Sequence, residues 1–143
     1  MTESDFRWLW AAYRKGGFET LPENMDIDEF TAAAFDHLNR FTEQFVVETD
    51  RPVGLILTLT DGYRFEPHAI WFPWASRRNI LEGTLKFLSQ ERRDRLGIIY
   101  MAMEFKRFLE QLARYGVIRR VGTVRNFFKP GEDALFFHTQ EFK

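Results

Sequence analysis

A pair of arginines stands where the sequence predicts the start of a long helix. Ser76 is a favourable N-cap residue, because its hydroxyl can accept a hydrogen bond from an amide of the first turn. Arg77, Arg78 and Asn79 follow it directly. The first amides of a helix have no partner within the helix, so a helix start attracts anions. Two cations at this end oppose the helix dipole by about 0.3–1 kcal/mol each. We therefore expect a negatively charged group near Arg77 and Arg78.

The predicted helix start follows a buried strand and a tight turn. Residues 68–72 form an almost continuous apolar run, which is typical of a strand covered on both faces. Pro73 ends this strand, because proline has no amide proton to give to a β-ladder. From Arg77 onward, apolar residues recur at the spacing of one helix face. Residues 65–95 thus predict a strand, a turn and an amphipathic helix.

The remaining sequence predicts two helices and two strands before this unit, and a strand, a helix and two strands after it. One expected helix runs from about Asp26 to Arg40, and the others follow Ser4, Ser76 and Met103. The expected strands lie at 44–49, 53–60, 68–72, 96–103, 117–124 and 134–139. The strand–helix–strand unit predicts a right-handed crossover between parallel strands, and hairpins flank it. The sequence therefore predicts a single α/β domain (mixed α+β) over residues 1–143, with a central twisted mixed sheet and helices on both faces.

Composition excludes several kinds of site. The 143 residues include no cysteine, so disulfides, thiolate metal sites and a cysteine nucleophile are excluded, and no metal site is expected. No apolar run approaches the ~20 residues that a membrane helix needs. The acidic N-terminus lacks the apolar region of a secretory signal, so we expect a cytoplasmic or virion-associated protein that is not secreted through a signal peptide.

Charge is divided unevenly along the chain. Residues 1–50 carry a net charge of −7 and residues 51–143 a net charge of +6. Such a split indicates either that the two halves face each other or that one face meets an anionic partner. The second half contains a basic cluster that could contact nucleic-acid phosphates, or pair with the acidic helices of the first half. Its members are Arg114, Arg119, Arg120, Arg125 and Lys129.

The order of elements resembles the GNAT (GCN5-related) fold of N-acetyltransferases. Residues 108–122, Phe-Leu-Glu-Gln-Leu-Ala-Arg-Tyr-Gly-Val-Ile-Arg-Arg-Val-Gly, look like the last helix of that family, its glycine stop and the strand after it. The likeness covers nearly the whole chain but lacks an obvious opening strand. For an enzyme, the resemblance implies acetyl-CoA as the cofactor and an amine as the acceptor.

The cofactor loop departs from the family pattern. In the family, an Arg or Gln is followed by two residues, a Gly, one residue, and a Gly or Ala, and the backbone amides cradle the pyrophosphate of acetyl-CoA. With Arg77 at the first position, Ile80 and Glu82 stand in the glycine places, and Gly83 comes one position late. A branched side chain and a carboxylate do not suit a diphosphate. The resemblance carries over Arg77, and residues 77–79 are the cofactor-binding candidates.

Catalytic groups match the family only in part. Many members use a tyrosine four residues before the helix-ending glycine as general acid, and Leu112 stands there. A general base would be sought on the strand before the loop, where Glu66 and His68 are the candidates. Both side chains also suit a structural role.

Three functions remain open on the sequence. Residues 71–82 and 114–122 also look like small phage-encoded GNAT-like proteins with a degenerate acetyl-CoA loop. This second resemblance implies a non-catalytic, structural or protein-binding component of a larger virion assembly, with no cofactor. The alternative is an acetyl-CoA-dependent N-acetyltransferase that acts on an amine. A nucleic-acid binder is the third. The altered loop and the aromatic content of 17% favour the first, so other protein subunits are the expected partners.

Overall fold

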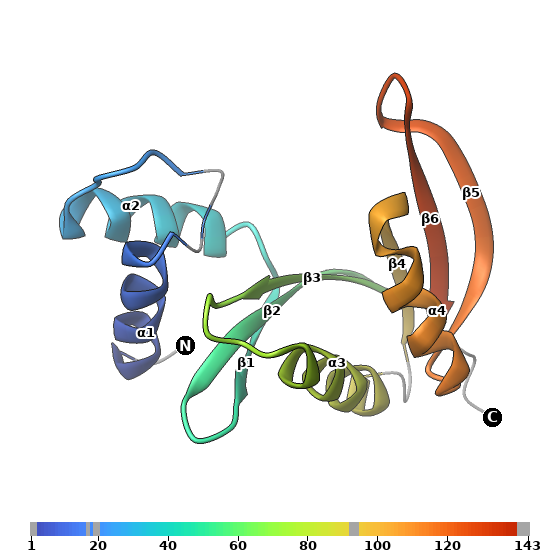
Figure 1. Ribbon diagram of the computed structural model, residues 1–143, viewed down its shortest axis with the longest axis horizontal. Helices are drawn as coiled ribbons and strands as arrows, with labels where there is room; N and C mark the ends of the chain where they lie inside the picture. The colour runs from blue at the N-terminus through green and yellow to red at the C-terminus, as the bar shows by residue number, and fades with distance from the viewer. Residues whose placement is uncertain (1–2, 17, 19–20, 92–94, 140–143) are drawn as a thin grey trace. The chain divides into compact units, whose positions relative to one another are not determined.

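The computed structural model describes residues 3–16, 18, 21–91 and 95–139 (Figure 1). The helices are α1 (Glu3–Arg14), α2 (Ile27–Leu38), α3 (Arg77–Glu91) and α4 (Lys106–Arg114), and a short 3-10 helix, η1 (Met103–Phe105), precedes α4. The strands are β1 (Glu43–Glu48), β2 (Pro52–Asp61), β3 (Arg64–Trp71), β4 (Leu96–Ala102), β5 (Ile118–Lys129) and β6 (Glu132–Thr139). The strand order is β1-β2-β3-β4-β6-β5, which confirms the predicted mixed α/β fold. The chain comprises two compact units, residues 1–60 with 68–83 and residues 61–67 with 84–143.

In the first unit, α1 and α2 share an apolar core with β2 and the end of β3. Helix α2 begins after Asp26, whose carboxylate accepts a hydrogen bond of 2.8 Å from the amide of Glu29. This hydrogen bond holds the pKa of Asp26 below its usual value. The buried residues of this core are Leu9, Ala12, Tyr13, Phe30, Ala34, Leu38, Leu55, Leu57 and Phe72.

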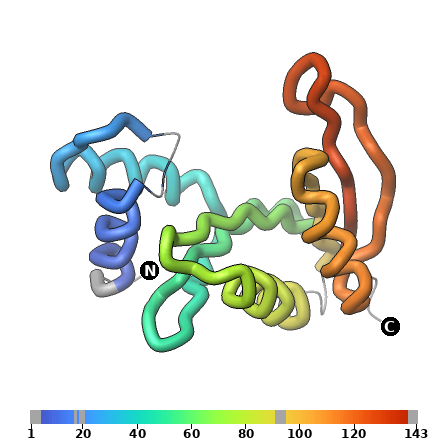
Figure 2. The backbone as a smooth tube through the Cα atoms, in the orientation of Figure 1, coloured from blue at the N-terminus to red at the C-terminus, as the bar shows by residue number. Residues whose placement is uncertain are grey.

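In the second unit, β6 lies between β4 and β5 and is antiparallel to both. Figure 2 shows β5 and β6 as the two arms of one long hairpin. The register between β5 and β6 shifts twice, between Arg120 and Gly122 and between Val124 and Lys129. Strand β5 is the edge strand in the observed order.

Strands β3 and β4 are parallel, as the strand–helix–strand unit predicts. Their described pairing joins Arg64 to Leu96 and Phe65 to Gly97, at the first residues of both strands. The buried ring of Phe65 and the side chain of Thr139 close over Gly97, and the amide of Gly97 donates to Thr139 Oγ1 at 2.8 Å. A side chain has no room at this position.

Some boundaries differ from the sequence prediction. Strand β3 begins at Arg64 rather than at residue 68, because the hairpin turn at Gly62 (φ 56°) leads directly into it. The last helix also begins after an extra 3-10 turn. Phe105 lies in this turn, η1, and is 42% exposed, since the turn separates β4 from α4. Leu109 and Leu112 are buried on α4.

Replacing Gly97 with alanine should lower the free energy of unfolding by roughly 1–3 kcal/mol, because overpacking forces neighbouring groups to move. A Cβ atom at this position would lie 2.6 Å from Phe65 Cζ and 2.8 Å from Thr139 Cγ2. Gly122→Ala is the matched control within a strand, since a Cβ atom there meets nothing within 4 Å. Urea unfolding of the two variants measures the difference, and an equal loss in both would contradict the packing argument.

Candidate functional site

The N-terminus of α3 is capped by side chains of its own first turn. Ser76 Oγ accepts a hydrogen bond of 3.0 Å from the amide of Asn79, and Asn79 Oδ1 accepts one of 3.0 Å from the amide of Ser76. This reciprocal arrangement is a capping box, and it confirms Ser76 as the N-cap. The side-chain oxygen of Asn79, a predicted cofactor-binding residue, thus serves the cap.

Arg78 and Glu82 form an ion pair on the surface of α3. Arg78 Nε lies 2.7 Å from Glu82 Oε1, and the two side chains are 83% and 59% exposed. The hydrogen bond to Glu82 and the charge of that carboxylate raise the pKa of Arg78. Glu82 is therefore partly neutralised by its own helix, which weakens the repulsion that its carboxylate would exert on a phosphate.

The positions that hold glycine in the family motif lie inside the helix here. The amide of Ile80 already donates to the carbonyl of Ser76 at 3.1 Å. Gly83 serves a different purpose, because a Cβ atom there would lie 2.6 Å from Val47 Cγ1 and 3.3 Å from Trp71 Cη2. The glycine lets α3 pack closely against β1 and β3, and it takes no part in a phosphate loop.

The first turn of α3 fits a phosphate group through the two arginines. The first backbone hydrogen bond of the helix is donated by the amide of Ile80. The amides of Arg77 and Arg78 come before it, so they have no acceptor within the helix. The exposed guanidinium of Arg77 lies on the same turn and can bind phosphate oxygens in pairs. Binding of the acetyl-CoA phosphates by residues 77–79 stays a prediction, and the glycine positions of the family motif are occupied by Ile80 and Glu82.

Glu66 on β3 contacts Tyr100 on β4 through a hydrogen bond between the carboxylate and the tyrosine hydroxyl. Burial, this hydrogen bond and the negative charge of Glu66 together raise the pKa of Tyr100 to about 12. Tyr100 consequently keeps its proton at neutral pH. The pair places a proton acceptor and a proton donor side by side, which is the minimum that acid–base chemistry requires.

The two predicted general-base candidates have different neighbours. Glu66 meets Tyr100, whereas the ring of His68 packs against Phe41 with centroids 5.5 Å apart. Phe41 in turn packs against His37 at 5.3 Å. His37 is exposed at the rim of an apolar pocket of about 170 Å³ in the first unit. Sequence analysis did not single out Tyr100, although a tyrosine within an apolar strand implies a partner for its hydroxyl.

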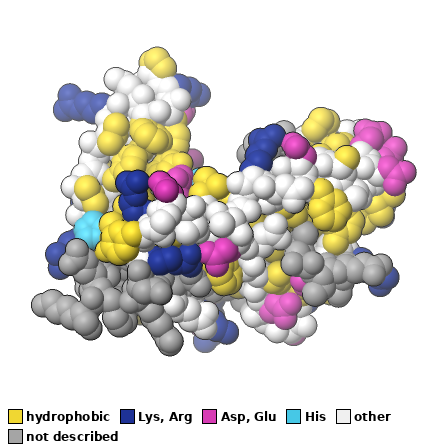
Figure 3. All heavy atoms as spheres, turned by 180° about the vertical axis from the view of Figure 1, so that it is seen from behind, with side chains coloured by type: hydrophobic (Ala, Val, Ile, Leu, Met, Phe, Trp, Pro, Cys, Tyr) yellow, Lys and Arg dark blue, Asp and Glu magenta, His cyan; other side chains and the backbone are white. Residues whose placement is uncertain are grey.

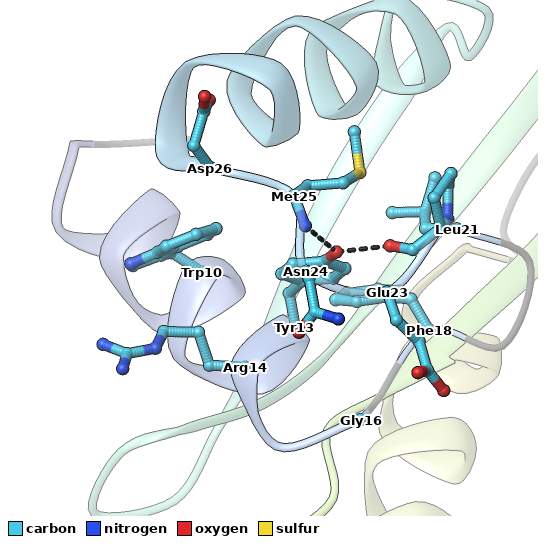
Figure 4. Close-up of a pocket in the computed structure, with 11 residues that line it drawn as sticks. Trp10, Tyr13, Arg14, Gly16, Phe18, Leu21, Glu23, Asn24, Met25 and Asp26 are labelled. Carbon is cyan, nitrogen blue, oxygen red and sulfur yellow. Dashed lines mark hydrogen bonds between the residues drawn. The ribbon is translucent and has the colours of Figure 1, made fainter.

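A larger pocket, of about 700 Å³, lies beside the segment between α1 and α2 (Figure 4). The hydroxyl of Tyr13 donates to the carbonyl of Pro22 and accepts a hydrogen bond of 2.9 Å from the amide of Met25. These bonds fix residues 22–25 against α1. Trp10 and Arg14 line the pocket from the helix side.

The basic cluster of the second half is exposed and spread along two elements. Arg114 ends α4, and the others lie on β5: Arg119, Arg120, Arg125 and Lys129. Lys129 Nζ already lies 3.1 Å from Glu132 Oε1. Nucleic-acid binding through this cluster stays a prediction.

Two other kinds of site are not found within the described ranges. No helix among the described residues is long and apolar enough to cross a membrane. In the same part of the chain, no three His, Asp or Glu side chains are grouped so that they could hold a metal ion.

Solved structures of N-acetyltransferases are similar to this chain in fold. A chimeric spermidine N-acetyltransferase from Vibrio cholerae superposes with a TM-score of 0.68 at 16% identity, covering 97% of this chain and 92% of that one. A ribosomal-protein-alanine N-acetyltransferase from Brucella melitensis gives 0.60 at 21% identity, covering 97% and 96%. The ribosomal-protein-S18-alanine N-acetyltransferase from Escherichia coli gives 0.61 at 13% identity, covering 100% and 92%. No protein-family model and no curated protein matches the sequence. The chain thus has the GNAT fold.

The raised pKa of Tyr100 predicts a late step in a spectrophotometric titration of the four tyrosines. Tyr100→Phe should remove the ionisation step near pH 12. The pKa of Tyr100 in the folded protein lies above its unfolded value of about 10, so the protonated tyrosine stabilises the fold at any pH below about 10. This contribution to the free energy of unfolding is lost as the pH rises from about 10 toward 12. Identical titration curves above pH 11, roughly one unit above that unfolded value, for the wild type and the variant would contradict the assignment.

Proposed function

We propose that this protein is an acetyl-CoA-dependent N-acetyltransferase that acts on an amine. The feature that carries the proposal is the placement of Glu66 on β3 and Tyr100 on β4, two neighbouring parallel strands, where Glu66 contributes to the raised pKa of Tyr100. The similarity to N-acetyltransferase structures over almost the whole chain supports it. Acetyl-CoA would supply an activated thioester, whose acetyl group passes to the amine nitrogen as the carbon–sulfur bond breaks.

Arg77 and Arg78 are the residues assigned to the phosphates of the cofactor. Their amides belong to the first turn of α3, where the helix dipole favours negative charge. The guanidinium of Arg77 adds charge-assisted hydrogen bonds. Arg78 keeps Glu82 paired at 2.7 Å, which limits the repulsion between this carboxylate and a bound phosphate.

Glu66 and Tyr100 are assigned to proton transfer. The carboxylate of Glu66 takes a proton from the ammonium form of the substrate, which frees the nitrogen lone pair for attack on the thioester carbonyl. Tyr100 holds its proton at Oη at neutral pH, because its pKa is raised to about 12, and can donate it to the departing thiolate. Glu66 would then return this proton to Tyr100, and the second proton of the nitrogen, which is lost as the amide forms, would pass to solvent.

The second candidate is a non-catalytic, protein-binding function of the phage-encoded type, with a degenerate cofactor site. Ile80 and Glu82 in the glycine places of the family motif favour it, since no backbone cradle is formed there. Several apolar side chains on β5 are also exposed, and such side chains often anchor protein contacts. Acetyl-CoA binding separates the two functions.

Acetyl-CoA should stabilise the protein against heat. At 100 times its Kd, a ligand adds ~2.7 kcal/mol, which raises the Tm of a domain of this size by roughly 5–10 °C. Arg77→Ala should weaken acetyl-CoA binding roughly 10- to 100-fold through the loss of charge-assisted hydrogen bonds. Arg40→Ala is the control, because Arg40 is likewise an exposed arginine but lies beyond the end of α2, away from the first turn of α3. No shift in Tm at millimolar acetyl-CoA would favour the second candidate.

Glu66→Gln should lower the turnover number for acetyl transfer about 10²- to 10⁴-fold, because glutamine cannot accept a proton. Release of free thiol from acetyl-CoA, in the presence of phenethylamine, spermidine or a peptide with an N-terminal alanine, measures this rate. Acetyl-CoA affinity should be unchanged. Glu110→Gln, which changes a half-buried carboxylate on α4, serves as the control. A Glu66→Gln variant with normal turnover would remove Glu66 from the mechanism.

A further inference from the structure

Three phenylalanine side chains gather around Tyr100, and we name these four residues the aromatic cluster: Tyr100, Phe127, Phe128 and Phe136. Tyr100 on β4 stacks on Phe136 of β6 with ring centroids 5.3 Å apart and an interplanar angle of 20°. Phe127 of β5 lies edge-on to both rings, at 5.2 Å from each. Phe128 meets Phe127 at 5.0 Å and Tyr100 at 6.4 Å. The cluster thus spans β4, β6 and β5 within one compact unit.

The outer part of the aromatic cluster is exposed. Phe127 is 42% and Phe128 44% exposed, although phenylalanine has no polar group to place in water. Hydrophobic side chains gather over the β5–β6 hairpin, at the upper left of Figure 3. Contiguous exposed apolar side chains of this kind mark binding sites more often than inert surface.

A carboxylate stands at the inner end of the same cluster. The hydroxyl of Tyr100 lies at Glu66, and the ring of Tyr100 contacts Phe127 and Phe136. Tyr100 therefore lies between the negative charge of Glu66 and the phenyl rings. A ligand that complements both ends carries a positive charge at one end and an apolar or aromatic group at the other. The arginines of β5 do not oppose such a ligand at its charged end, because β4 and β6 stand between β3 and β5 in the sheet.

We propose that Glu66 and the aromatic cluster form the acceptor site, and that the acceptor is an arylalkyl primary amine. Its ammonium group would bind at the carboxylate of Glu66, and its ring would pack against Phe127 and Phe128. This inference rests on the proposed function, in which Glu66 removes the proton from the same nitrogen. It narrows the substrate class from amines in general to amines that carry an aromatic group a few bonds from the nitrogen.

Self-association through the same face is the competing explanation. Pairing of β5 with β5 of a second copy would bring together strands that each carry Arg119, Arg120 and Arg125, and like charges on facing strands are destabilising. Charge therefore favours a small cation at Glu66 over a second copy at β5. The oligomeric state of the protein decides between the two.

Ligand-detected NMR with phenethylamine, in the absence of acetyl-CoA, tests the site directly. Phenethylamine should bind at least about tenfold more tightly than 2-phenylethanol, which lacks the charge, and than spermidine, which lacks the ring. Phe127→Ala and Phe128→Ala should each weaken phenethylamine binding about tenfold. Phe105→Ala is the matched control, because Phe105 belongs to the same unit, is also 42% exposed and lies outside the cluster.

A further variant controls for the possibility that an alanine substitution weakens binding only because the hairpin unfolds. Phe127→Leu keeps an apolar side chain in the hairpin, so it should fold normally and still bind phenethylamine more weakly than the wild type. Equal binding by the wild type and all three cluster variants would overturn the inference. A change in oligomeric state by light scattering, with unchanged phenethylamine binding, would overturn it in favour of self-association.

The outcomes separate this inference from the proposed function. Binding of phenethylamine that depends on the cluster, without any acetyl transfer, would support the site and refute the N-acetyltransferase. Acetyl transfer to spermidine or to a peptide, without phenethylamine binding, would overturn the inference alone.

Discussion

The contact between Phe65 and Gly97 is the constraint on which the rest of the second unit depends. It holds β3 and β4 in parallel register at their first residues, and the ring occupies the space of a side chain at position 97. Successive side chains of a strand point to opposite faces, so a buried Phe65 directs Glu66 to the other face of the sheet. There Glu66 meets Tyr100. The position of the Glu66 carboxylate thus depends on a glycine on the neighbouring strand.

The start of α3 is a helix terminus that is stabilised by its own side chains. Ser76 and Asn79 satisfy each other's amides, so the helix needs no ligand to begin there. The amides of Arg77 and Arg78 remain outside this arrangement. In the proposed function, phosphate binding would therefore rest on charge and on these two amides rather than on a glycine loop. The packing of Gly83 against Val47 keeps this turn close to the sheet.

Local features were predictable because they depend on neighbouring residues. The cap at Ser76, the end of α4 at Gly116 (φ 80°) and the order of elements all follow from short sequence patterns. The Glu66–Tyr100 pair was not predictable, since it depends on the register between two strands separated by a helix. The exposure of Phe127 was not predictable either, because it depends on the position of β5 in the sheet. A hairpin pattern does not reveal which of its two strands becomes the edge, and here β6 takes the inner position.

The two register shifts of β5 have a consequence for the protein at high concentration. A long, flat, apolar edge strand is a template on which identical chains can add and grow into cross-β fibrils. Each shift interrupts the regular row of amides and carbonyls and increases the local twist, so an incoming strand cannot continue the ladder along the full length of β5. The chain can therefore display aromatic side chains at this edge and still resist fibril growth.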